Sequence, residues 1–581
     1  MSSKPVDLLI VGAGLHGLIM AKTYLEVHPS ATLLVVDEAQ SVGGTWARER
    51  IYPGLKTNNL FGSYELSDFP MDAKRYGVDG TGHIPGHVVH AYLCDVADHF
   101  GITPHLMLNT KVAETRVVND GSWEAFLQSG ASSDRSIYTV RATKLVFATG
   151  LTSKPHIPHI PGSEDFQRSI IHSKQLKAQA GQLADSKTVV VVGGNKSAWD
   201  VCYTAARAGS QVHMVIRPSG GGPSYLWPRR FSLGPFEVSL AKLSTIRLFT
   251  LFDPSPFGAG PFSWVRNFLH RTFIGQRISQ WFWTYLDKEI RRLNGFHTHP
   301  ELCKLEPWTT PFWMGNSLSI HNYETCWFDL VREGRINIHI ADLESLSPAR
   351  VHLSDGAIIE TDALVLCTGW TADVPAHFAS DGVDEAEEKA SKKTIYEDIS
   401  YFSHLSRRTS NAPVCQDSFI SPKSSKDTTF PLLYRDILPV EERYLQSRSL
   451  AFIGMSVSIH AVLVAQAQAL WITAFFSDEL DNCRAGQMDR ERLRSRAILD
   501  RVYGQVRRPR ETGGLAGRHA DLVFDSLSYV DGLFSDLAVP CARKKNWWRE
   551  LTDPYCLVDY CGLVQEWMRL RGIESRAIQR N

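Results

Sequence analysis

The sequence predicts an α/β protein with two nested dinucleotide-binding (Rossmann-like) domains, and three observations support this fold class. An apolar strand over residues 6–11 runs into a glycine-rich turn and then a helical pattern. The same order of strand, turn and helix recurs from residue 187. Two further apolar strands that end in Thr-Gly, 144–150 and 363–369, lie on either side of this second unit. They indicate chain crossings, so the second domain is predicted to be inserted into the first.

The first turn reads Gly12-Ala-Gly14-Leu-His-Gly17. In such a turn the glycines permit a tight bend, a close approach of the backbone to a pyrophosphate, and close packing of helix on strand. A second apolar strand ends at Asp37, 25 residues beyond Gly12, where a carboxylate can accept the hydroxyls of an adenosine ribose. We therefore expect Gly12, Gly14, Gly17 and Asp37 to bind a dinucleotide.

The second turn reads Gly193-Gly-Asn195-Lys196-Ser197, and its unit closes at Arg217, 24 residues beyond Gly193. An acid at this position suits a bare ribose, whereas an arginine suits a 2′-phosphate. The simplest assignment is FAD in the first domain and NADPH in the second, with these five residues as NADPH contacts. Asn195 stands where a second glycine normally allows phosphate approach; asparagine tolerates the turn but puts that approach in doubt.

Further short motifs accompany the two turns: Gly43-Gly44-Thr45-Trp46, Tyr52-Pro53-Gly54, Thr57-Asn58, Ser67-Asp68-Phe69-Pro70, Tyr92-Leu93 with His99-Phe100, and PLLYRDILP at 431–439 followed by FIGM. With them the chain resembles the class B flavin monooxygenases, the flavin-containing and Baeyer-Villiger monooxygenases, over about 1–217 and 361–477. The family motif FxGxxxH falls at 166–172, with Arg168 in place of glycine. The resemblance implies that NADPH reduces bound FAD and that O2 then forms a C4a-(hydro)peroxyflavin.

The resemblance also implies roles for single residues. Asn58 and Arg217 are the expected catalytic residues. The Asn58 amide can donate a hydrogen bond to a peroxide, which an ionised carboxylate, common there in the Baeyer-Villiger branch, cannot do. Arg217 matches an arginine that contacts NADPH in both branches and so does not choose between them. The further flavin contacts expected in the first domain are Gly44, Thr45, Trp46, Thr57, Gly150 and Gly454, the last before a helix whose N-terminus would face the flavin.

The predicted domains are 1–165 (FAD domain, first part), 166–360 (NADPH domain with a helical cap at 218–330), 361–485 (return of the FAD domain) and 486–581 (C-terminal extension). The segment from Trp199 to residue 330 holds eight of the 15 tryptophans. An aromatic insertion of this kind favours a cap over an apolar substrate. Ordinary packing of inserted helices is an equal alternative, and a peripheral membrane surface is a third.

Composition and charge exclude several classes of function. Sixty-two basic residues balance 62 acidic ones, so no net field draws the protein to nucleic acid. The ten cysteines are scattered without CxxC spacing, which argues against a zinc site or a disulfide framework. Together with the predicted strand close to the amino terminus, this favours a cytoplasmic protein. Residues 449–477 lack charged side chains over 29 residues, long enough for a membrane span, although His460, Gln466 and Gln468 favour a buried strand and helix.

The predicted function is FAD-dependent, NADPH-consuming monooxygenation of a hydrophobic small molecule by O2, in secondary metabolite biosynthesis of a fungal type. A Baeyer-Villiger reaction, which converts a ketone to an ester or lactone, stays open as an alternative. A disulfide-type FAD reductase would need CxxxxC near the first turn, where Cys94 stands alone; the spacing occurs instead at Cys556 and Cys561. A flavoprotein without catalytic activity is the remaining alternative, suggested by Asn195 and Arg168.

Overall fold

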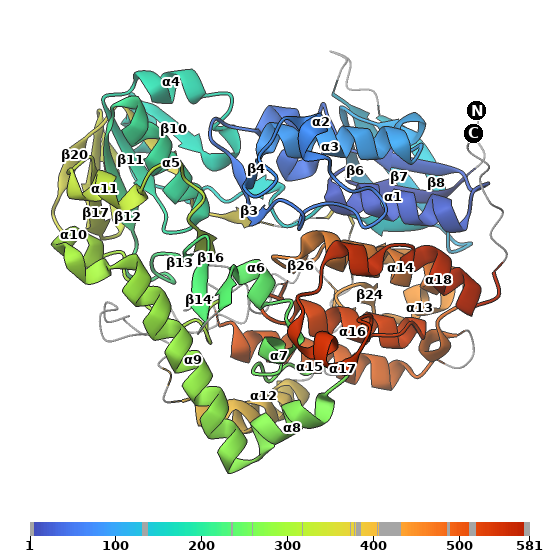
Figure 1. The fold of residues 1–581 in the computed structure, drawn as a ribbon. Coiled ribbons are helices and arrows are strands. Elements are labelled where there is room, and N and C mark those ends of the chain that lie inside the picture. Colours follow the sequence, from blue (N-terminus) through green and yellow to red (C-terminus); the bar gives the residue numbers. More distant parts are fainter. Residues whose placement is uncertain are drawn as a thin grey trace.

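The protein is described by a computed structural model, in which two sheet domains lie above a helical lower half (Figure 1). The structure describes residues 5–130, 137–233, 236–257, 260–315, 318–371, 374–376, 378, 385–403, 405, 431–484, 488–509 and 519–573. The chain forms the first domain, passes into the second, and returns to the first before it forms the C-terminal helices.

The first domain is a seven-stranded sheet in the order β5-β2-β1-β8-β7-β6, with β25 paired to β8. Its strands are β1 (Val6–Val11), β2 (Leu33–Val36), β5 (Leu106–Met107), β6 (Thr110–Val117), β7 (Trp123–Ser129), β8 (Ile137–Phe147) and β25 (Leu450–Phe452). β1 runs parallel to β2 and β8, as the apolar strands of a dinucleotide-binding unit require. β25 is parallel to β8, so the chain rejoins the first sheet about 300 residues after leaving it.

The second domain is a five-stranded parallel sheet in the order β10-β21-β11-β12-β17. Its strands are β10 (Ser169–His172), β11 (Thr188–Val192), β12 (Gln211–Ile216), β17 (Ile336–Ile340) and β21 (Ala363–Leu366). The predicted α/β class with nested Rossmann-like sheets is therefore confirmed. The predicted boundary at residue 361 moves, because β21 lies between β10 and β11. All four of its apolar residues are fully buried, and the second domain therefore extends past Leu366.

Helices of an insertion between β12 and β17 and of the C-terminal segment occupy much of the lower half of Figure 1. The insertion contains α6 (Leu240–Leu243), α7 (Arg247–Thr250), α8 (Ser263–Arg271) and α9 (Phe273–Asn294), and the C-terminal segment contains α15 (Arg490–Arg507), α16 (Ser526–Leu537), α17 (Trp547–Thr552) and α18 (Leu563–Leu570). Buried ion pairs join them: Arg247 contacts Asp531 and Glu550, and Arg507 contacts Asp253. The buried carboxylates neutralise arginines that would be costly if left unpaired.

The uncharged stretch 449–477 forms β25, β26 (Ser456–Val457) and α14 (Ala461–Phe476). α14 packs against α1 (Leu15–Val27) and α16, and its residues from Val462 to Phe476 are buried. Among the described residues, no helix combines the length and the apolar character needed to cross a membrane. The alternative of a membrane span at 449–477 is therefore wrong: this stretch is a core strand and a core helix.

Candidate functional site

The first nucleotide turn needs its outer glycines for steric reasons. Gly12 has φ +116°, and a Cβ there would lie 2.4 Å from the carbonyl oxygen of Ala148. A Cβ on Gly17 would lie 1.9 Å from the carbonyl oxygen of Gly12. Both distances are far inside van der Waals contact, so the bend from β1 and the close approach of α1 both require glycine.

Gly14 packs against Gly44 at the N-terminus of α1. A Cβ on Gly14 would meet only Gly44, at 3.5 Å from its Cα, and no side chain caps the N-terminus of α1. Gly150 has φ +66°, and a Cβ there would meet nothing within 4 Å. This arrangement leaves the first N–H groups of α1 available to an anion in a cradle lined by backbone.

Asp37 lies at the carboxyl end of β2, beside this cradle. Its Oδ2 accepts a hydrogen bond from the Ala13 N–H at 2.6 Å, and its Oδ1 accepts one from the Ala39 N–H at 2.8 Å. Burial raises the pKa of Asp37, and these two N–H donors oppose that rise. Each carboxylate oxygen keeps a second lone pair, so Asp37 can still accept ribose hydroxyls as predicted.

Thr45 and Trp46 follow Gly44 and bond inside the first domain. The Thr45 hydroxyl is 3.0 Å from the hydroxyl of Thr152, and the Trp46 indole N–H donates to the Tyr64 hydroxyl at 2.8 Å. Thr45 is exposed and Trp46 is half-buried. These residues line the wall beside the turn, and their polar groups are engaged by the protein.

Asn58 lies in the middle of β3 (Lys56–Leu60), between two residues that fix the strand. The Thr57 hydroxyl donates to the Asn59 carbonyl at 2.7 Å and accepts from the Ile84 N–H at 3.0 Å. The Asn59 amide donates to the Ile459 carbonyl at 2.7 Å. Because side chains alternate along a strand, Asn58 points to the face opposite Thr57 and Asn59.

The side chains of Thr57 and Asn59 both bond to backbone carbonyl groups. The Thr57 side chain, expected at the flavin, is buried and bonded to backbone. Asn59, which the sequence did not single out, joins β3 to the segment before α14. Only this tertiary contact, made over 400 residues of sequence, identifies its role.

Gly454 joins the returning chain to the first turn. It has φ +74°, and a Cβ there would lie 2.7 Å from the ring of His16, which stands between Gly14 and Gly17. The Gly454 N–H donates to the Gln468 side chain at 3.1 Å. Its N–H is thus engaged by the protein, and the glycine itself is required by the close approach of His16.

The N-terminus of α14 contacts the insertion. α14 begins at Ala461, beyond β26, so it does not follow directly on Gly454 and Met455. His460 precedes it, and its Nε2 lies 2.8 Å from the Ser244 hydroxyl of the insertion. Burial lowers the pKa of His460 to about 4, so the imidazole is neutral at pH 7.

The second nucleotide turn also requires glycine, and the residue that precedes its helix is exposed to solvent. A Cβ on Gly193, at φ +142°, would lie 2.6 Å from the Cys367 carbonyl oxygen. Asn195 is exposed at the N-terminus of α5 (Lys196–Ala208), which no side chain caps, and Ser197 is half-buried. Arg217 follows β12 directly, is exposed, and forms no ion pair with a described residue. The uncapped helix and the free guanidinium suit a phosphorylated nucleotide.

Lys196 is engaged at the junction of the two domains. It forms an ion pair with Asp200 and donates to the Asn322 side chain at 2.9 Å. Asn322 donates to the Thr57 carbonyl at 3.3 Å, and the Tyr52 hydroxyl donates to Asp200 at 2.8 Å. This polar cluster joins the first domain, the second domain and the insertion. The sequence pointed to Lys196 and, through the Tyr52-Pro53-Gly54 motif, to Tyr52, but not to Asp200 or Asn322.

The two chain crossings between the domains lie side by side. β9 (Lys154–Pro155) pairs antiparallel with β22 (Trp370–Thr371). His172 is buried at the end of β10, and its Nε2 lies 3.1 Å from the Gly369 carbonyl oxygen. His172 thus stabilises the crossing, while Arg168 is exposed near it.

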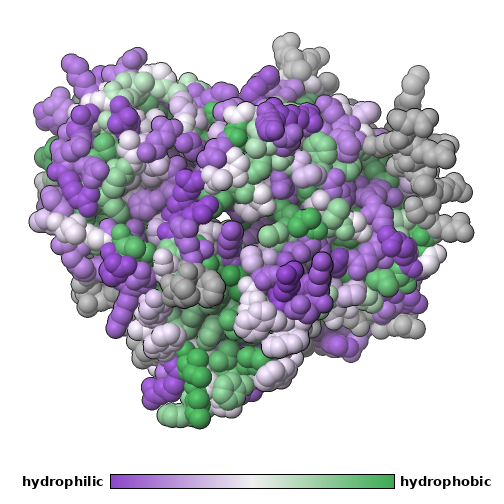
Figure 2. Space-filling view, viewed as in Figure 1, coloured by the Kyte–Doolittle hydropathy of each residue, from purple (hydrophilic) through white to green (hydrophobic). Residues whose placement is uncertain are grey.

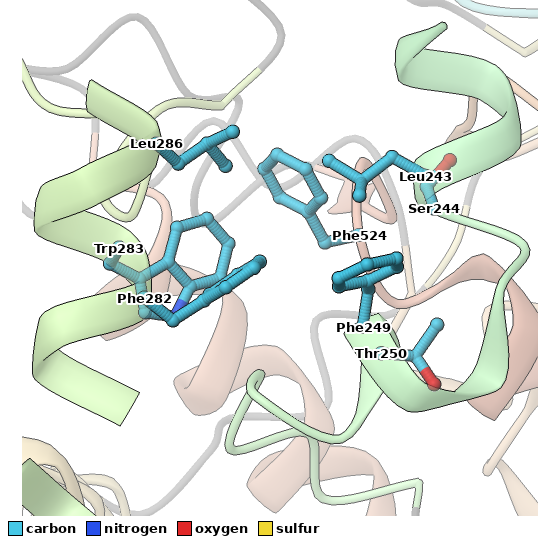
Figure 3. Close-up of a pocket in the computed structure, with 8 residues that line it drawn as sticks. All are labelled: Leu243, Ser244, Phe249, Thr250, Phe282, Trp283, Leu286 and Phe524. Carbon is cyan, nitrogen blue, oxygen red and sulfur yellow. The ribbon is translucent and has the colours of Figure 1, made fainter. Parts of the chain in front are cut away.

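An aromatic cavity lies between the insertion and the C-terminal segment (Figure 3). Its lining residues are Leu243, Ser244, Phe249, Thr250, Phe282, Trp283, Leu286 and Phe524. Its free volume is about 10 Å³, room for about one water molecule. Ser244 bonds His460, so the cavity adjoins the N-terminus of α14.

The fold and site define a flavoprotein with two dinucleotide domains. The profile of a family described as pyridine nucleotide-disulphide oxidoreductase matches residues 9–225. An FAD-dependent monooxygenase of Pyrenophora dematioidea is 34% identical and covers 93% of this chain and 99% of its own length. One of Aspergillus sclerotiorum is 33% identical and covers 97% and 98%. The chain belongs to this family of FAD-dependent monooxygenases.

Solved structures share the fold at low identity. A cyclohexanone monooxygenase with bound ε-caprolactone has a TM-score of 0.56 at 15% identity, covering 99% of both chains. An S-allyl-L-cysteine S-oxygenase of Allium sativum has a TM-score of 0.52 at 15% identity, covering 99% and 96%. The relatives favour a monooxygenase over the reductase alternative. The nine cysteines in the described ranges, Cys556 and Cys561 included, are free thiols.

Proposed function

We propose that this FAD-dependent monooxygenase takes its electrons from NADPH and inserts one atom of O2 into a hydrophobic small molecule, in fungal secondary metabolism. The observation that best supports this proposal is the position of Asn58 on β3. Asn59 links this strand to the segment before α14, and Asn322 and Lys196 link it to the second nucleotide turn. The overall reaction consumes NADPH, H⁺, O2 and substrate, and it yields NADP⁺, water and the oxygenated product.

FAD would be held by the first turn. Gly12, Gly14 and Gly17 shape the cradle, the first turn of α1 faces the pyrophosphate, and Asp37 accepts the ribose hydroxyls. Bound FAD supplies hydride acceptance and the reaction with O2. The neutral His16 ring and Gly454 close the other side of this turn.

NADPH would be held by the second turn. The uncapped N-terminus of α5 and the free Arg217 guanidinium can bind the pyrophosphate and the 2′-phosphate. Lys196 is already paired with Asp200, so its main part is to fix the second domain against β3 through Asn322. We therefore assign recognition of the 2′-phosphate to Arg217 alone.

Asn58 would donate a hydrogen bond to oxygen at the reacting edge of the flavin. A carboxamide N–H on a strand held from both sides is a preorganised donor in a partly buried site. Hydride transfer from NADPH needs no such donor, so the two half-reactions depend differently on Asn58.

The test measures the half-reactions separately. The Asn58→Ala variant, reduced anaerobically by NADPH in a stopped-flow instrument, should react at near the parent rate. After O2 is admitted with substrate, it should release most of the oxygen as hydrogen peroxide, and Asn337→Ala, on β17 of the second domain, should stay coupled like the parent. An Asn58→Ala enzyme that still forms one product per NADPH would remove Asn58 from this role. NMR of the product shows whether oxygen entered a carbon–carbon bond, as in a Baeyer-Villiger reaction.

A further inference from the structure

The corner where α8 meets α9 exposes an unusual set of apolar side chains. Trp264 on α8 is 71% exposed, and Phe273, Ile274 and Trp281 on α9 are 72%, 64% and 65% exposed. With the partly exposed Phe268, Ile278 and Tyr285 they form a continuous surface, here named the α8–α9 corner. Figure 2 shows green apolar atoms at the lowest point of the molecule, where Figure 1 places these two helices.

α9 is apolar on two opposite faces. Ile274, Ile278, Trp281 and Tyr285 follow the spacing of one helical stripe and point outward. Phe282, Trp283 and Leu286 point inward and line the aromatic cavity (Figure 3). A helix on the surface of a soluble protein normally presents polar residues outward, so the outer stripe needs a partner.

The charged side chains of the α8–α9 corner itself are basic. Residues 254–286 contain no Asp or Glu, in a protein whose acidic and basic residues are equal in number. Arg271 and Arg277 are exposed beside the apolar residues, and neither pairs with a carboxylate in the described ranges. The Arg277 guanidinium lies 5.2 Å from the centre of the Phe273 ring. The corner is therefore aromatic, aliphatic and positively charged.

We propose that the α8–α9 corner docks onto the surface of a lipid bilayer that carries anionic headgroups. Tryptophan, tyrosine and phenylalanine favour the boundary between headgroups and acyl chains, and arginines at the same level attract the anionic lipids. The corner projects from the molecule, so it can enter a deformable lipid surface, whereas a rigid protein partner would need a matching hollow. This inference is independent of the proposed catalytic roles.

Sedimentation with vesicles tests the proposal on the purified, FAD-loaded full chain. The protein should co-sediment with phosphatidylcholine vesicles that contain about 30% phosphatidylserine, and bind vesicles of phosphatidylcholine alone at least about tenfold more weakly. Ile274→Glu should weaken binding to the anionic vesicles by about tenfold or more, because a carboxylate replaces an inserted side chain. The matched control is Ile137→Glu on β8 of the first domain, where the isoleucine is 63% exposed; it should bind like the parent. Equal FAD content and melting temperature of both variants confirm their folding.

A second variant tests the charge. Arg271→Ser combined with Arg277→Ser should abolish the preference for phosphatidylserine. The proposal is overturned if the parent binds no vesicle, if it binds both vesicle types equally, or if Ile274→Glu and Ile137→Glu behave alike. It is also overturned in favour of a second copy of this chain if the parent is a dimer by light scattering that Ile274→Glu converts to a monomer without a change in vesicle binding.

Discussion

The two nucleotide turns share one pattern of sequence but differ in their surroundings. In the first turn, Gly12 and Gly17 are required by backbone contacts at 2.4 and 1.9 Å, and a Cβ on Gly14 would lie 3.5 Å from the Cα of Gly44. In the second turn, Asn195 is exposed and the next residue, Lys196, is paired with Asp200. The residue that precedes the helix is thus exposed in the second turn and half-buried in the first.

The difference also concerns what each turn is joined to. The first packs against the returning chain through His16 and Gly454, inside one domain. The second is joined to another domain through the polar cluster of Lys196, Asp200, Asn322 and Tyr52. The second turn is therefore linked to the first domain by polar contacts, whereas the first turn makes this contact with the returning chain within its own domain.

The largest expected effect is the loss of flavin from the first turn. Gly14→Val should yield colourless protein, because a Cβ there already touches the Gly44 backbone and the valine methyl groups would crowd the uncapped N-terminus of α1, where the pyrophosphate is proposed to bind. The absorbance of bound flavin after purification measures this. Gly504→Ala in α15, where a Cβ meets nothing within 4 Å, is the matched control and should keep full flavin. Full occupancy in Gly14→Val would place the pyrophosphate elsewhere.

The next effect is a dependence of stability on pH that belongs to the first turn. Burial lowers the pKa of His16 to about 4, below the 6.5 expected when the chain is unfolded. As the pH falls below about 6.5, the unfolded chain binds a proton that the folded chain does not, so the free energy of unfolding decreases. Between pH 8 and pH 5 this amounts to at most about 2 kcal/mol.

Urea unfolding at the two pH values checks this expectation. His16→Gln should lose about 2 kcal/mol less than the parent between pH 8 and pH 5. His87→Gln, at an exposed histidine of the same domain, should follow the parent. If His16→Gln also follows the parent, His16 is not a buried neutral imidazole in the folded enzyme.

The smallest effect separates NADPH from NADH at the second turn. Arg217→Ala should raise KM for NADPH about tenfold, equivalent to about 1.4 kcal/mol, and leave KM for NADH within about twofold. Steady-state NAD(P)H oxidation measures both values. Arg207→Ala, an exposed arginine on α5, serves as the control and should change neither. A parallel rise for both nucleotides would give Arg217 a role other than binding the 2′-phosphate.

The local sequence pattern was sufficient to predict those parts of the site that are formed by a single short segment. The strands, the glycines and Asp37 follow from spacing within about 25 residues, because a tight turn and a buried parallel strand restrict residue types directly. The order of chain crossings was predictable too, from the strands at 144–150 and 363–369. The position of β21 was not, since an apolar strand fits either sheet equally well by composition.

Side chains that form contacts between domains could not be predicted from the sequence. The sequence did not show that the Thr57 hydroxyl, expected at the flavin, bonds to the backbone of Asn59 and Ile84. Asn59 and Asn322 were not singled out, because their partners are 400 and 265 residues away and no spacing rule connects them. Asp200 lies four residues after Lys196 on α5, a spacing that could have indicated the ion pair. Polar residues of this kind acquire a role only when the tertiary structure brings their partners to them.

The paired crossings β9 and β22 limit how the second domain can move. A single covalent tether allows a domain to swivel about its own axis, but two antiparallel tethers bonded to each other permit bending and resist twisting. His172 and the Gly369 carbonyl strengthen the pair at the end of β10. The second domain should therefore bend toward and away from the first domain about this pair, with little rotation about its own axis. Such bending would change the distance between Arg217 and β3 and keep the same face of the second nucleotide turn toward the first domain.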